Sequence, residues 1–220
     1  MRNYDTPVRA IRHKVYVEVA KAGFESTDET LIHDIEAIPY NIVEEKAKYR
    51  ESIYRERAVA SERVRLAMGL SLRPENKAVH LTDGLAASNI DEKYYEPPLI
   101  NVIKFACNAC PEKSFHVTNL CQGCLAHPCK EVCPKGAISI VHGKSVIDQE
   151  KCVKCGQCAN VCPYGAINKM ERPCAKACGM DAIGSDELGR ATINYDKCVS
   201  CGMCLVNCPF GAIADKSQIF

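Results

Sequence analysis

The sequence lacks the segments that would carry a protein out of the cytoplasm or into a membrane. Its N-terminus, MRNYDTPVRAIRHKVYVEVA, has no uninterrupted apolar stretch of signal-peptide length. No window reaches the roughly 18 apolar residues that a membrane-spanning helix requires. We therefore expect a cytoplasmic protein with no membrane partner, whose cysteines are reduced and bind metal instead of forming disulfides.

An excess of charge of either sign is also absent. Lysine and arginine total 28, aspartate and glutamate total 27, and the formal net charge is +1. Because the basic residues are interleaved with acidic ones, we expect no nucleic-acid partner. The sequence contains no GxGxxG, Walker or flavin-binding motif, so it does not predict a self-contained reductase.

Cysteine is absent before Cys107, and this first part of the chain differs in composition from the rest. It is rich in paired charges and predicts a helical N-terminal region and linker over 1–98. Residues 5–7, with the sequence DTP, supply a helix cap and a first-turn proline. Apolar residues then recur at helical spacing until Gly23, which is typical of an amphipathic helix with one side facing a core.

Two more helices are expected before the first cysteine. Ser26 and Glu29 predict a capping box for a short helix that ends at Pro39. A longer helical pattern covers 41–69, with glutamates and arginines three and four residues apart. The segment 71–98 has only weak patterning, which indicates a linker.

The arginines of the 41–69 pattern allow two interpretations. They could form a docking face for an acidic partner, or a solvated helix face with salt bridges. The interleaved glutamates favour the solvated face. The arginines are Arg50, Arg55, Arg57, Arg63 and Arg65, and the glutamates are Glu51, Glu56 and Glu62.

Beyond residue 98 the chain repeats a short phrase. The copies are CPKGAI from 133, CPYGAI from 162, CGMDAI from 178 and CPFGAI from 208. Two long intervals on either side of a short one indicate two paired units, each with room for a hairpin, at 138–147 and 182–194. We predict an α+β fold in which the helical region precedes two tandem ferredoxin-like units. Their ranges are 99–170, with an arm that carries Cys107 and Cys110, and 171–220.

The cysteine spacing indicates the cofactor. The run C-x2-C-x2-C-x3-C-P, which starts at Cys152 and again at Cys198, is the bacterial ferredoxin pattern, in which three cysteines hold one [4Fe-4S] cube and the fourth holds the other. Gly156 and Gly202 let the backbone turn closely around a cube. Zinc sites more often use two C-x2-C pairs with a longer spacer, so we favour iron and sulfur over zinc.

Four [4Fe-4S] clusters account for all sixteen cysteines. A C-x2-C-x4-C-x3-C-P variant completes the predicted first unit, and the fourth cysteines cross between its halves. Cluster 1 is assigned to Cys121, Cys124, Cys129 and Cys162, and cluster 2 to Cys152, Cys155, Cys158 and Cys133. Apolar surroundings are expected from Ile138, Ile167, Ile183 and Ile213.

The predicted second unit lacks two thiols in its first half, because the ferredoxin spacing falls on Asn168 and Glu171. The unused pair before the first unit has the same x2 spacing. Cluster 3 is therefore assigned to Cys198, Cys201, Cys204 and Cys178, and cluster 4 to Cys107, Cys110, Cys174 and Cys208. Two alternatives stay open: Cys107 and Cys110 could be free or hold zinc, and His116 or His127 could be a ligand, although no histidine is required.

Several phrases resemble the N-terminal iron–sulfur region of group B monomeric [FeFe] hydrogenases over nearly the whole chain. They are DTPVRAIRHKV, YRERAVASERVRLAMG, NVIKFACNACPEKSFHVTNLCQGCLAHPCKEVCPKGAISI, ERPCAKACGMDAI and CVSCGMCLVNCPFGAIADKSQI. The resemblance implies an anaerobic setting and a catalytic H-domain, in the same chain or another, that is supplied by ferredoxin-like clusters. The T-S-C-C-P signature of that domain is absent, so we expect no hydrogen turnover by this chain alone.

The function predicted from the sequence is one-electron transfer along four clusters, to or from a redox protein such as a hydrogenase catalytic domain. A ferredoxin or flavodoxin is the external electron partner to consider. No side chain is expected to act as acid, base or nucleophile. The alternative is a redox-sensing or structural metal-binding protein, because clusters also hold small folds together.

Overall fold

The computed structural model describes residues 6–88 and 97–217. Asp5 of the predicted helix cap and residues 89–96 of the predicted linker lie outside the described residues. Within the described residues the chain mixes helices with short antiparallel strand pairs, as the α+β prediction required.

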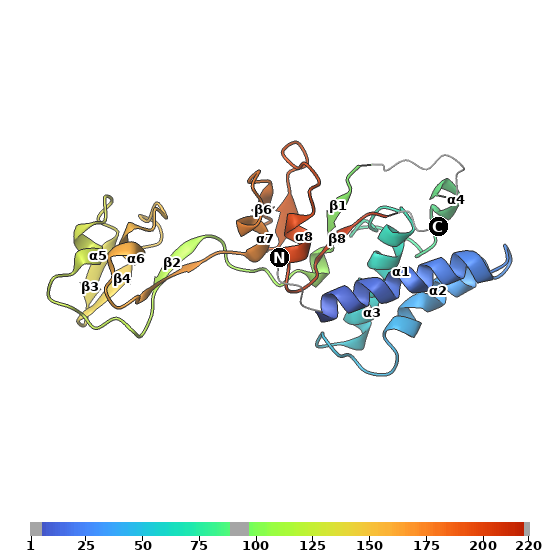
Figure 1. The fold of residues 1–220 in the computed structure, drawn as a ribbon, viewed down its shortest axis with the longest axis horizontal. Helices are drawn as coiled ribbons and strands as arrows, with labels where there is room; N and C mark the ends of the chain where they lie inside the picture. The colour runs from blue at the N-terminus through green and yellow to red at the C-terminus, as the bar shows by residue number, and fades with distance from the viewer. Residues whose placement is uncertain (1–5, 89–96, 218–220) are drawn as a thin grey trace. The chain divides into compact units, whose positions relative to one another are not determined.

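The chain folds into two compact units. The larger unit comprises Met1–Ala109 together with Pro173–Phe220, and the inserted unit is Cys110–Arg172. Figure 1 shows the course of the chain by colour, with the green-to-orange inserted unit between two parts of the larger one in sequence.

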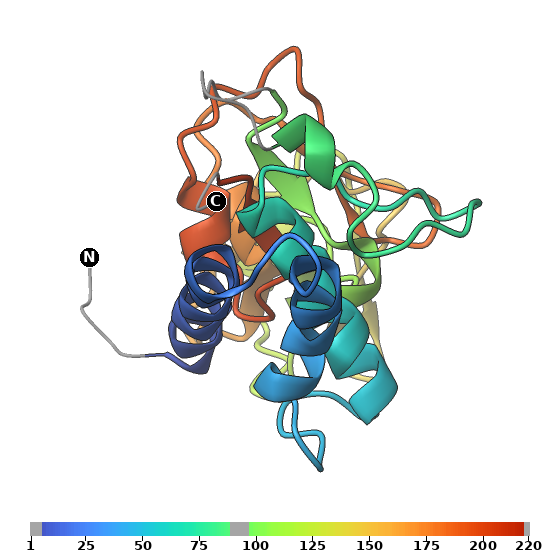
Figure 2. The same ribbon diagram turned by 90° about the vertical axis from the view of Figure 1, so that its right-hand side faces the viewer.

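Three helices pack against one another in the larger unit (Figures 1 and 2). They are α1 (Pro7–Glu25), α2 (Leu31–Ile42) and α3 (Ile53–Ala67), and a short α4 (Leu85–Ser88) follows. Thr6 caps α1 as predicted, because its Oγ1 accepts a hydrogen bond from Arg9 N at 3.3 Å. Helix α1 continues for two residues beyond Gly23, where the sequence predicted its end. The helices share one apolar core that contains Val15, Val19, Ile35, Ile38, Val64 and Ala67.

The predicted capping box of the second helix is wrong. Thr30 is the N-cap of α2, and Ser26 Oγ instead donates a hydrogen bond to Asp34 Oδ2 at 2.7 Å. Pro39 lies inside the helix and does not end it. Its ring is tolerated close to the C-terminus because Ile35 and Ile38, on the same turn, are buried in the core and hold the helix in place.

The long helix predicted over 41–69 is shorter at its start. Residues 41 and 42 are the end of α2, and residues 43–51 are irregular with several bends. Helix α3 begins after Ser52, whose Oγ accepts a hydrogen bond from Tyr54 N at 3.2 Å. At the other end Gly69 has φ +80°, and Leu70 N donates to Arg65 O at 2.9 Å. This left-handed glycine ends the helix where the sequence predicted.

The expectation of a solvated face on α3 is wrong for its central residues. Glu62, Arg63 and Arg65 are only 3%, 7% and 6% exposed. One side of α3 packs into the core shared with α1 and α2, while Val59 and Leu66 pack into a second core. A helix covered on two sides has to satisfy its charged groups internally.

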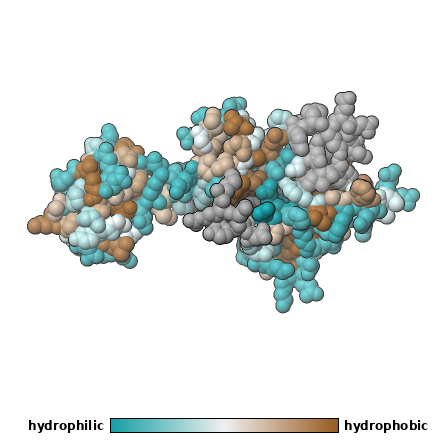
Figure 3. Space-filling view, in the orientation of Figure 1, coloured by the Kyte–Doolittle hydropathy of each residue, from teal (hydrophilic) through white to brown (hydrophobic). Residues whose placement is uncertain are grey.

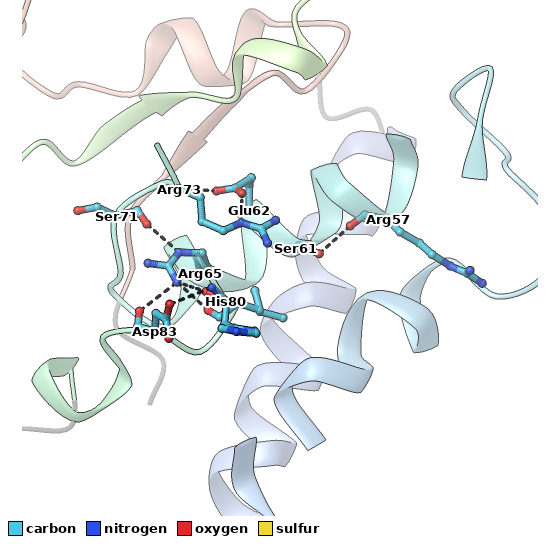
Figure 4. A network of polar contacts seen from close by, with 9 residues as sticks. Arg57, Ser61, Glu62, Arg65, Ser71, Arg73, His80 and Asp83 are labelled. Atoms are coloured by element: carbon cyan, nitrogen blue, oxygen red, sulfur yellow. Dashed lines mark hydrogen bonds and ion pairs between the residues drawn. The ribbon is translucent and has the colours of Figure 1, made fainter. Parts of the chain in front are cut away.

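Buried polar groups of α3 hold the loop that follows the helix (Figure 4). Arg65 donates to the backbone oxygens of Ser71, His80, Leu81 and Asp83 at 2.8–3.0 Å. The Glu62 carboxylate accepts from Arg73 Nε at 2.6 Å and from Arg73 N at 3.0 Å. The weakly patterned segment after α3 is therefore anchored to the helix by hydrogen bonds to charged groups.

The inserted unit consists of two strand pairs and two short helices. Strand β2 (Ser114–Val117) pairs antiparallel with β5 (Ile167–Met170), and β3 (Ile138–Val141) pairs with β4 (Lys144–Ile147). Helices α5 (Pro128–Glu131) and α6 (Gln157–Val161) contact each other. The hairpin predicted over 138–147 is confirmed, and His142 and Gly143 both have positive φ in its two-residue turn.

The C-terminal part of the larger unit is built from the same kinds of element. Strand β1 (Ile100–Val102) pairs antiparallel with β8 (Ile213–Asp215), and β6 (Ile183–Ser185) pairs with β7 (Ala191–Ile193). A 3₁₀ turn η1 (Lys104–Ala106) follows β1, and helices α7 (Pro173–Lys176) and α8 (Met203–Asn207) contact each other. The hairpin predicted within 182–194 is also confirmed.

The division of the chain differs from the three consecutive segments predicted. Residues 99–109, expected to start the predicted first unit, belong to the larger unit because β1 pairs with the C-terminal strand β8. The helical region packs with that same C-terminal part, through α3 and β8. The inserted unit therefore interrupts another fold between Ala109 and Pro173.

Exposed apolar side chains occur among polar ones on the surface of the inserted unit, as the brown and teal residues of Figure 3 show. Leu120, Leu125, Val153 and Tyr164 are between 50% and 96% exposed.

In residues 6–88 and 97–217, we find no helix with the length and apolar character needed to cross a membrane.

Candidate iron-sulfur sites

Three open pockets are each lined by four cysteines in the combinations predicted for clusters 1 to 3. In the inserted unit, one pocket contains Cys121, Cys124, Cys129 and Cys162, and another contains Cys133, Cys152, Cys155 and Cys158. In the larger unit, the third contains Cys178, Cys198, Cys201 and Cys204. The structure thus brings the fourth cysteine of one half to the first three of the other half in each case.

The three pockets resemble one another in lining. Each is open to solvent and lined by four cysteines together with apolar side chains, so one kind of occupant would suit all three. Ile138, Ile167 and Ile183 line one pocket each, as predicted from the sequence. All sixteen cysteines lie in the described part of the chain, and none forms a disulfide.

The C-x2-C loops share one backbone conformation. The residue before the second cysteine has positive φ in every loop: Ala109 at +44°, Gly123 at +60°, Lys154 at +58° and Ser200 at +54°. Three of these four are not glycine, and a left-handed backbone is uncommon for such residues. The loop at 107–110 therefore has the same local geometry as the three loops that line pockets.

The third cysteine of each set is buried on a short helix. Cys129 lies on α5, Cys158 on α6, Cys174 on α7 and Cys204 on α8, and each is no more than 8% exposed. Cys174 therefore corresponds to a third ligand, although in the sequence it stands far from its C-x2-C pair.

The fourth cysteine of each set begins a tight turn. The residue three positions later has positive φ at Gly136, Gly165, Asp181 and Gly211. The next backbone N–H donates back to the sulfur in three sets, at 3.3 Å from Ala137 to Cys133, and at 3.4 Å from Ala166 to Cys162 and from Ala182 to Cys178. Such N–H···S bonds orient thiolates and are one of the factors that tune cluster potential.

Three of the four cysteines predicted for cluster 4 meet in the larger unit. Cys174 is buried in a core with Leu205 and Ile213, and Cys107 and Cys208 pack against the same core. Ala191 N donates to Cys107 Sγ at 3.3 Å. Cys110 is the first residue of the inserted unit, so its connection to this set is through the loop it shares with Cys107.

Burial affects the acidity of the thiols. It raises the pKa of Cys204 to about 11 and also raises the pKa of Cys158. Backbone N–H groups, first that of Ser145, lower the pKa of Cys121. A thiol whose pKa is about 11 is protonated at neutral pH, so binding to iron has to displace its proton.

The predicted histidine alternatives receive no support from the geometry. His116 is exposed and its Nε2 lies 3.0 Å from Ser114 Oγ, while His127 precedes α5 with φ +41°. Neither lines any of the three cysteine pockets. In the described ranges, no three cysteine, histidine or carboxylate side chains are arranged to hold a single metal ion.

Two residues near the sites were missed by the sequence reasoning. Phe115 is buried, lines the pocket of Cys133 and Cys152, and would lie 3.0 Å from a Cβ placed on Gly156. Arg63 of α3 donates to Gly211 O at 2.6 Å, beside Cys208. The alternation of Phe115 with polar neighbours could have indicated a buried strand residue, whereas an arginine among glutamates carries no such signal.

Family comparisons agree with this geometry. A family model described as a 4Fe-4S binding domain matches residues 145–168, and one described as the LdpA Fe-S cluster-binding domain matches 169–219. Together with the cysteine pockets, these matches define the class: the chain contains ferredoxin-like domains that bind [4Fe-4S] clusters.

The curated relatives belong to the same class. An uncharacterized ferredoxin of Methanocaldococcus jannaschii is 41% identical over 66 residues, which are 29% of this chain and 44% of that protein. The electron transport protein HydN of Escherichia coli is 37% identical over 82 residues, 37% of this chain and 43% of HydN. A probable iron-sulfur protein of the Frd operon of Proteus vulgaris is 36% identical over 91 residues, 40% of this chain and 52% of that protein. The chain spans about half the length of these relatives.

Proposed function

We propose that this chain is a one-electron carrier with four [4Fe-4S] clusters, arranged as two ferredoxin-like units of which one is inserted into the other. The ligands are those predicted from the sequence. They are Cys121, Cys124, Cys129 and Cys162 for cluster 1, Cys152, Cys155, Cys158 and Cys133 for cluster 2, Cys198, Cys201, Cys204 and Cys178 for cluster 3, and Cys107, Cys110, Cys174 and Cys208 for cluster 4.

The observation that carries the proposal is the fourfold repetition of one local structure. Each set has a C-x2-C loop with a left-handed residue before its second cysteine, a buried third cysteine on a short helix, and a fourth cysteine at the start of a tight turn. A ferredoxin places ligands in this order along the chain. The repetition includes the fourth set and so supports a fourth cluster.

The insertion accounts for the two thiols that the second unit lacks in sequence. Strand β1 precedes Cys107 as β2 precedes Cys121, and each strand pairs with the strand that follows its unit's last cysteine. The chain leaves the larger unit after Ala109 and returns to it at Pro173, one residue before Cys174. Asn168 and Glu171 fall at the expected ligand positions only because they end the inserted unit.

The chain's own contribution to electron transfer is to hold the clusters and set their potentials. Isoleucines and alanines exclude water beside the thiolates, and backbone N–H groups donate to the sulfurs of the fourth cysteines. A bound [4Fe-4S] cluster supplies a reversible one-electron couple, with potentials in its class of roughly −700 to +450 mV. No protein side chain has to act as acid, base or nucleophile.

The proposed partner is a redox enzyme, in particular an [FeFe] hydrogenase catalytic domain supplied by the same polypeptide or another one. This finer part of the proposal is supported by the resemblance of the chain to the N-terminal iron–sulfur region of group B hydrogenases. The names of several relatives, which are ferredoxins and electron transport proteins, support electron transfer as the general role.

Metal analysis and spectroscopy test the cluster proposal. Anaerobically purified protein should contain about four irons and four sulfides per cluster, and dithionite should produce the EPR signals of reduced [4Fe-4S] clusters. A colourless protein, or one that contains zinc, would contradict it. A purely structural role of the clusters would be indicated by the absence of reversible one-electron reduction. With hydrogen and a viologen dye we expect no turnover by this chain alone.

The ligand assignment of cluster 4 is tested by Cys107→Ser. We expect the variant to lose the equivalent of one cluster in iron content and to keep the other three, because only one set contains Cys107. Asn108→Ala, which alters the same loop without removing a sulfur, is the matched control and should keep all four. Full iron content in Cys107→Ser would show that the assignment is wrong.

A further inference from the structure

Helix α3 places a buried cation beside Cys208. Arg63 is 7% exposed, and its Nη2 donates to Gly211 O at 2.6 Å. Its Nε and Nη1 are buried and have no hydrogen-bond partner among the described residues. Buried arginines are normally paired with an anion, because an unpaired charge away from water costs several kcal/mol. Two nitrogens of the Arg63 guanidinium are therefore left for an anion close to this position.

The charges around Arg63 identify where that partner lies. Arg12 and Arg50 are its charged neighbours of the same sign, and Arg50 Nη2 donates to Phe210 O at 2.6 Å. The nearby Asp215 is already engaged by Arg12 at 2.9 Å. Cys208 begins the turn whose carbonyl oxygens, those of Phe210 and Gly211, accept from Arg50 and Arg63, so a thiolate at Cys208 is an anion close to both arginines. Burial lowers the pKa of Arg63 to about 10, which agrees with a cation that lacks its counter-charge.

We propose that Arg63, assisted by Arg50, is the counter-charge of the cluster held by Cys208 and raises that cluster's reduction potential. This inference rests on the proposed function, since it requires cluster 4 to be present. An oxidised cube with four thiolates carries a formal charge of about −2, and one electron from an external donor makes it about −3, with no proton or bond transferred. A fixed cation in a buried setting stabilises the more negative state more strongly.

Among the described residues, Arg63 is buried and Arg50 is half-buried next to the turn that begins at Cys208. Lysines occur near the other sites, but Lys135 beside Cys133 and Lys144, which acts on Cys121, are exposed. Water and salt screen exposed charges far more than buried ones. We therefore expect the electrostatic effect of Arg63 and Arg50 to be specific to cluster 4.

The test is a redox titration of the anaerobic holoprotein, followed by EPR, for Arg63→Met and Arg50→Met. The component of cluster 4 is identified as the one missing from Cys107→Ser. In Arg63→Met we expect its reduction equilibrium to shift about tenfold or more toward the oxidised state, which is a potential lower by about 59 mV or more for a one-electron couple. Arg50→Met should shift it in the same direction and by less, since Arg50 is only half-buried.

Controls separate an electrostatic role from a structural one. Arg63→Lys keeps the charge and should restore most of the potential, although it loses the planar guanidinium. Arg57→Met removes an arginine of the same helix that donates to Val43 O at 3.0 Å, and it should leave cluster 4 unchanged.

The possible outcomes distinguish failure of this inference from failure of the proposed function. Four clusters with an unchanged cluster 4 potential in both Arg63→Met and Arg50→Met would overturn the inference and leave the proposed function intact. A wild-type protein without [4Fe-4S] clusters would instead contradict the proposed function. If Arg63→Met does not fold, Arg50→Met decides between these outcomes by the same titration.

Discussion

At the scale of single residues, equivalent positions of the repeat carry different constraints. Gly165 and Gly211 occupy the same place after a fourth cysteine, with φ of +59° and +58°. Asp181 takes the same backbone conformation in another copy, so a side chain is tolerated there. What distinguishes Gly211 is its neighbours: an added Cβ would lie 2.5 Å from Arg63 Nη2 and 2.9 Å from Val8 Cγ1, whereas nothing lies within 4 Å at Gly165.

Gly211→Ala should therefore destabilise the protein more than Gly165→Ala. Both substitutions force a left-handed alanine, at about 1 kcal/mol. Gly211→Ala also overpacks against α3, which typically adds about 1–3 kcal/mol. Thermal denaturation of the anaerobic holoproteins measures the difference as a lower midpoint for Gly211→Ala. Equal midpoints would mean that the close contact between the added Cβ and Arg63 does not affect stability.

Arg65 is a second residue whose role is purely local. Because its guanidinium donates to four backbone oxygens, Arg65→Met would remove the partner of one buried and three part-buried carbonyls, and we expect a loss of about 3 kcal/mol in the free energy of unfolding. Urea denaturation followed by circular dichroism measures it. Arg65→Lys should recover only part of the lost free energy of unfolding, since lysine lacks the planar guanidinium that donates to several oxygens at once. Arg55→Met, at a more exposed position on the same helix, should cost much less.

At the scale of elements, α3 packs on one side with the N-terminal helices and on another with the residues around Cys107 and Cys208. Val64 and Ala67 pack with α1 and α2, while Val59 and Leu66 pack with residues near Cys107 and Cys208. Ser217 N also donates to Leu66 O at 2.8 Å. The apolar residues of α3 are thus spread around the helix, which is the pattern of a helix that is buried on more than one side.

The start of α3 depends on Ser52. Ser52→Ala removes the side-chain oxygen that accepts from Tyr54 N, and we expect it to cost about 1 kcal/mol. Ser52→Asp keeps an oxygen that can cap the helix and should be close to the wild type in stability. Urea denaturation monitored by circular dichroism compares the three proteins. An alanine variant as stable as the wild type would contradict the assigned cap.

At the scale of the whole molecule, the chain is organised by an insertion. The larger unit contains the N-terminal helices and the strands and helices of the C-terminal part, and the inserted unit interrupts it between Ala109 and Pro173. Near the two ends of the inserted unit, β2 and β5 pair antiparallel. This pairing brings the place where the chain enters the unit close to the place where it leaves. A compact insertion with adjacent ends interrupts its host with little disturbance.

Removal of the inserted unit should leave a larger unit that still binds clusters. Deletion of 111–171 would create the run Cys107-Asn-Ala-Cys110-Arg-Pro-Cys174-Ala-Lys-Ala-Cys178, which has the uninterrupted C-x2-C-x2-C-x3-C spacing. We expect this shortened protein to bind two clusters, with about half the iron of the full chain. Iron analysis and EPR of the reduced protein are the measurements. A shortened protein that folds but holds one cluster would contradict the proposed role of Cys107 and Cys110.

Sequence reasoning was most successful where the chemistry is local. The spacing of thiols within a few residues predicted the cysteine sets that share pockets, because a tight loop can present its sulfurs to only one place. The two hairpins followed from short β-rich segments around turn residues. Helix boundaries such as those at Thr30 and Ser52 were missed because competing capping residues lie within a few positions of each other.

The sequence by itself determined the class of cofactor and the loops that carry the thiols, since both depend on residue types at short spacing. Only the tertiary structure decided that residues 99–109 pair with the C-terminal strand, that one unit is inserted into the other, and that Arg63 is buried beside Cys208. The strand pairing and the Arg63 contact each join residues more than a hundred positions apart, and the insertion joins Ala109 to Pro173. They arise from strand pairing and from the burial of α3 on two sides, and neither leaves a periodic signal in the sequence.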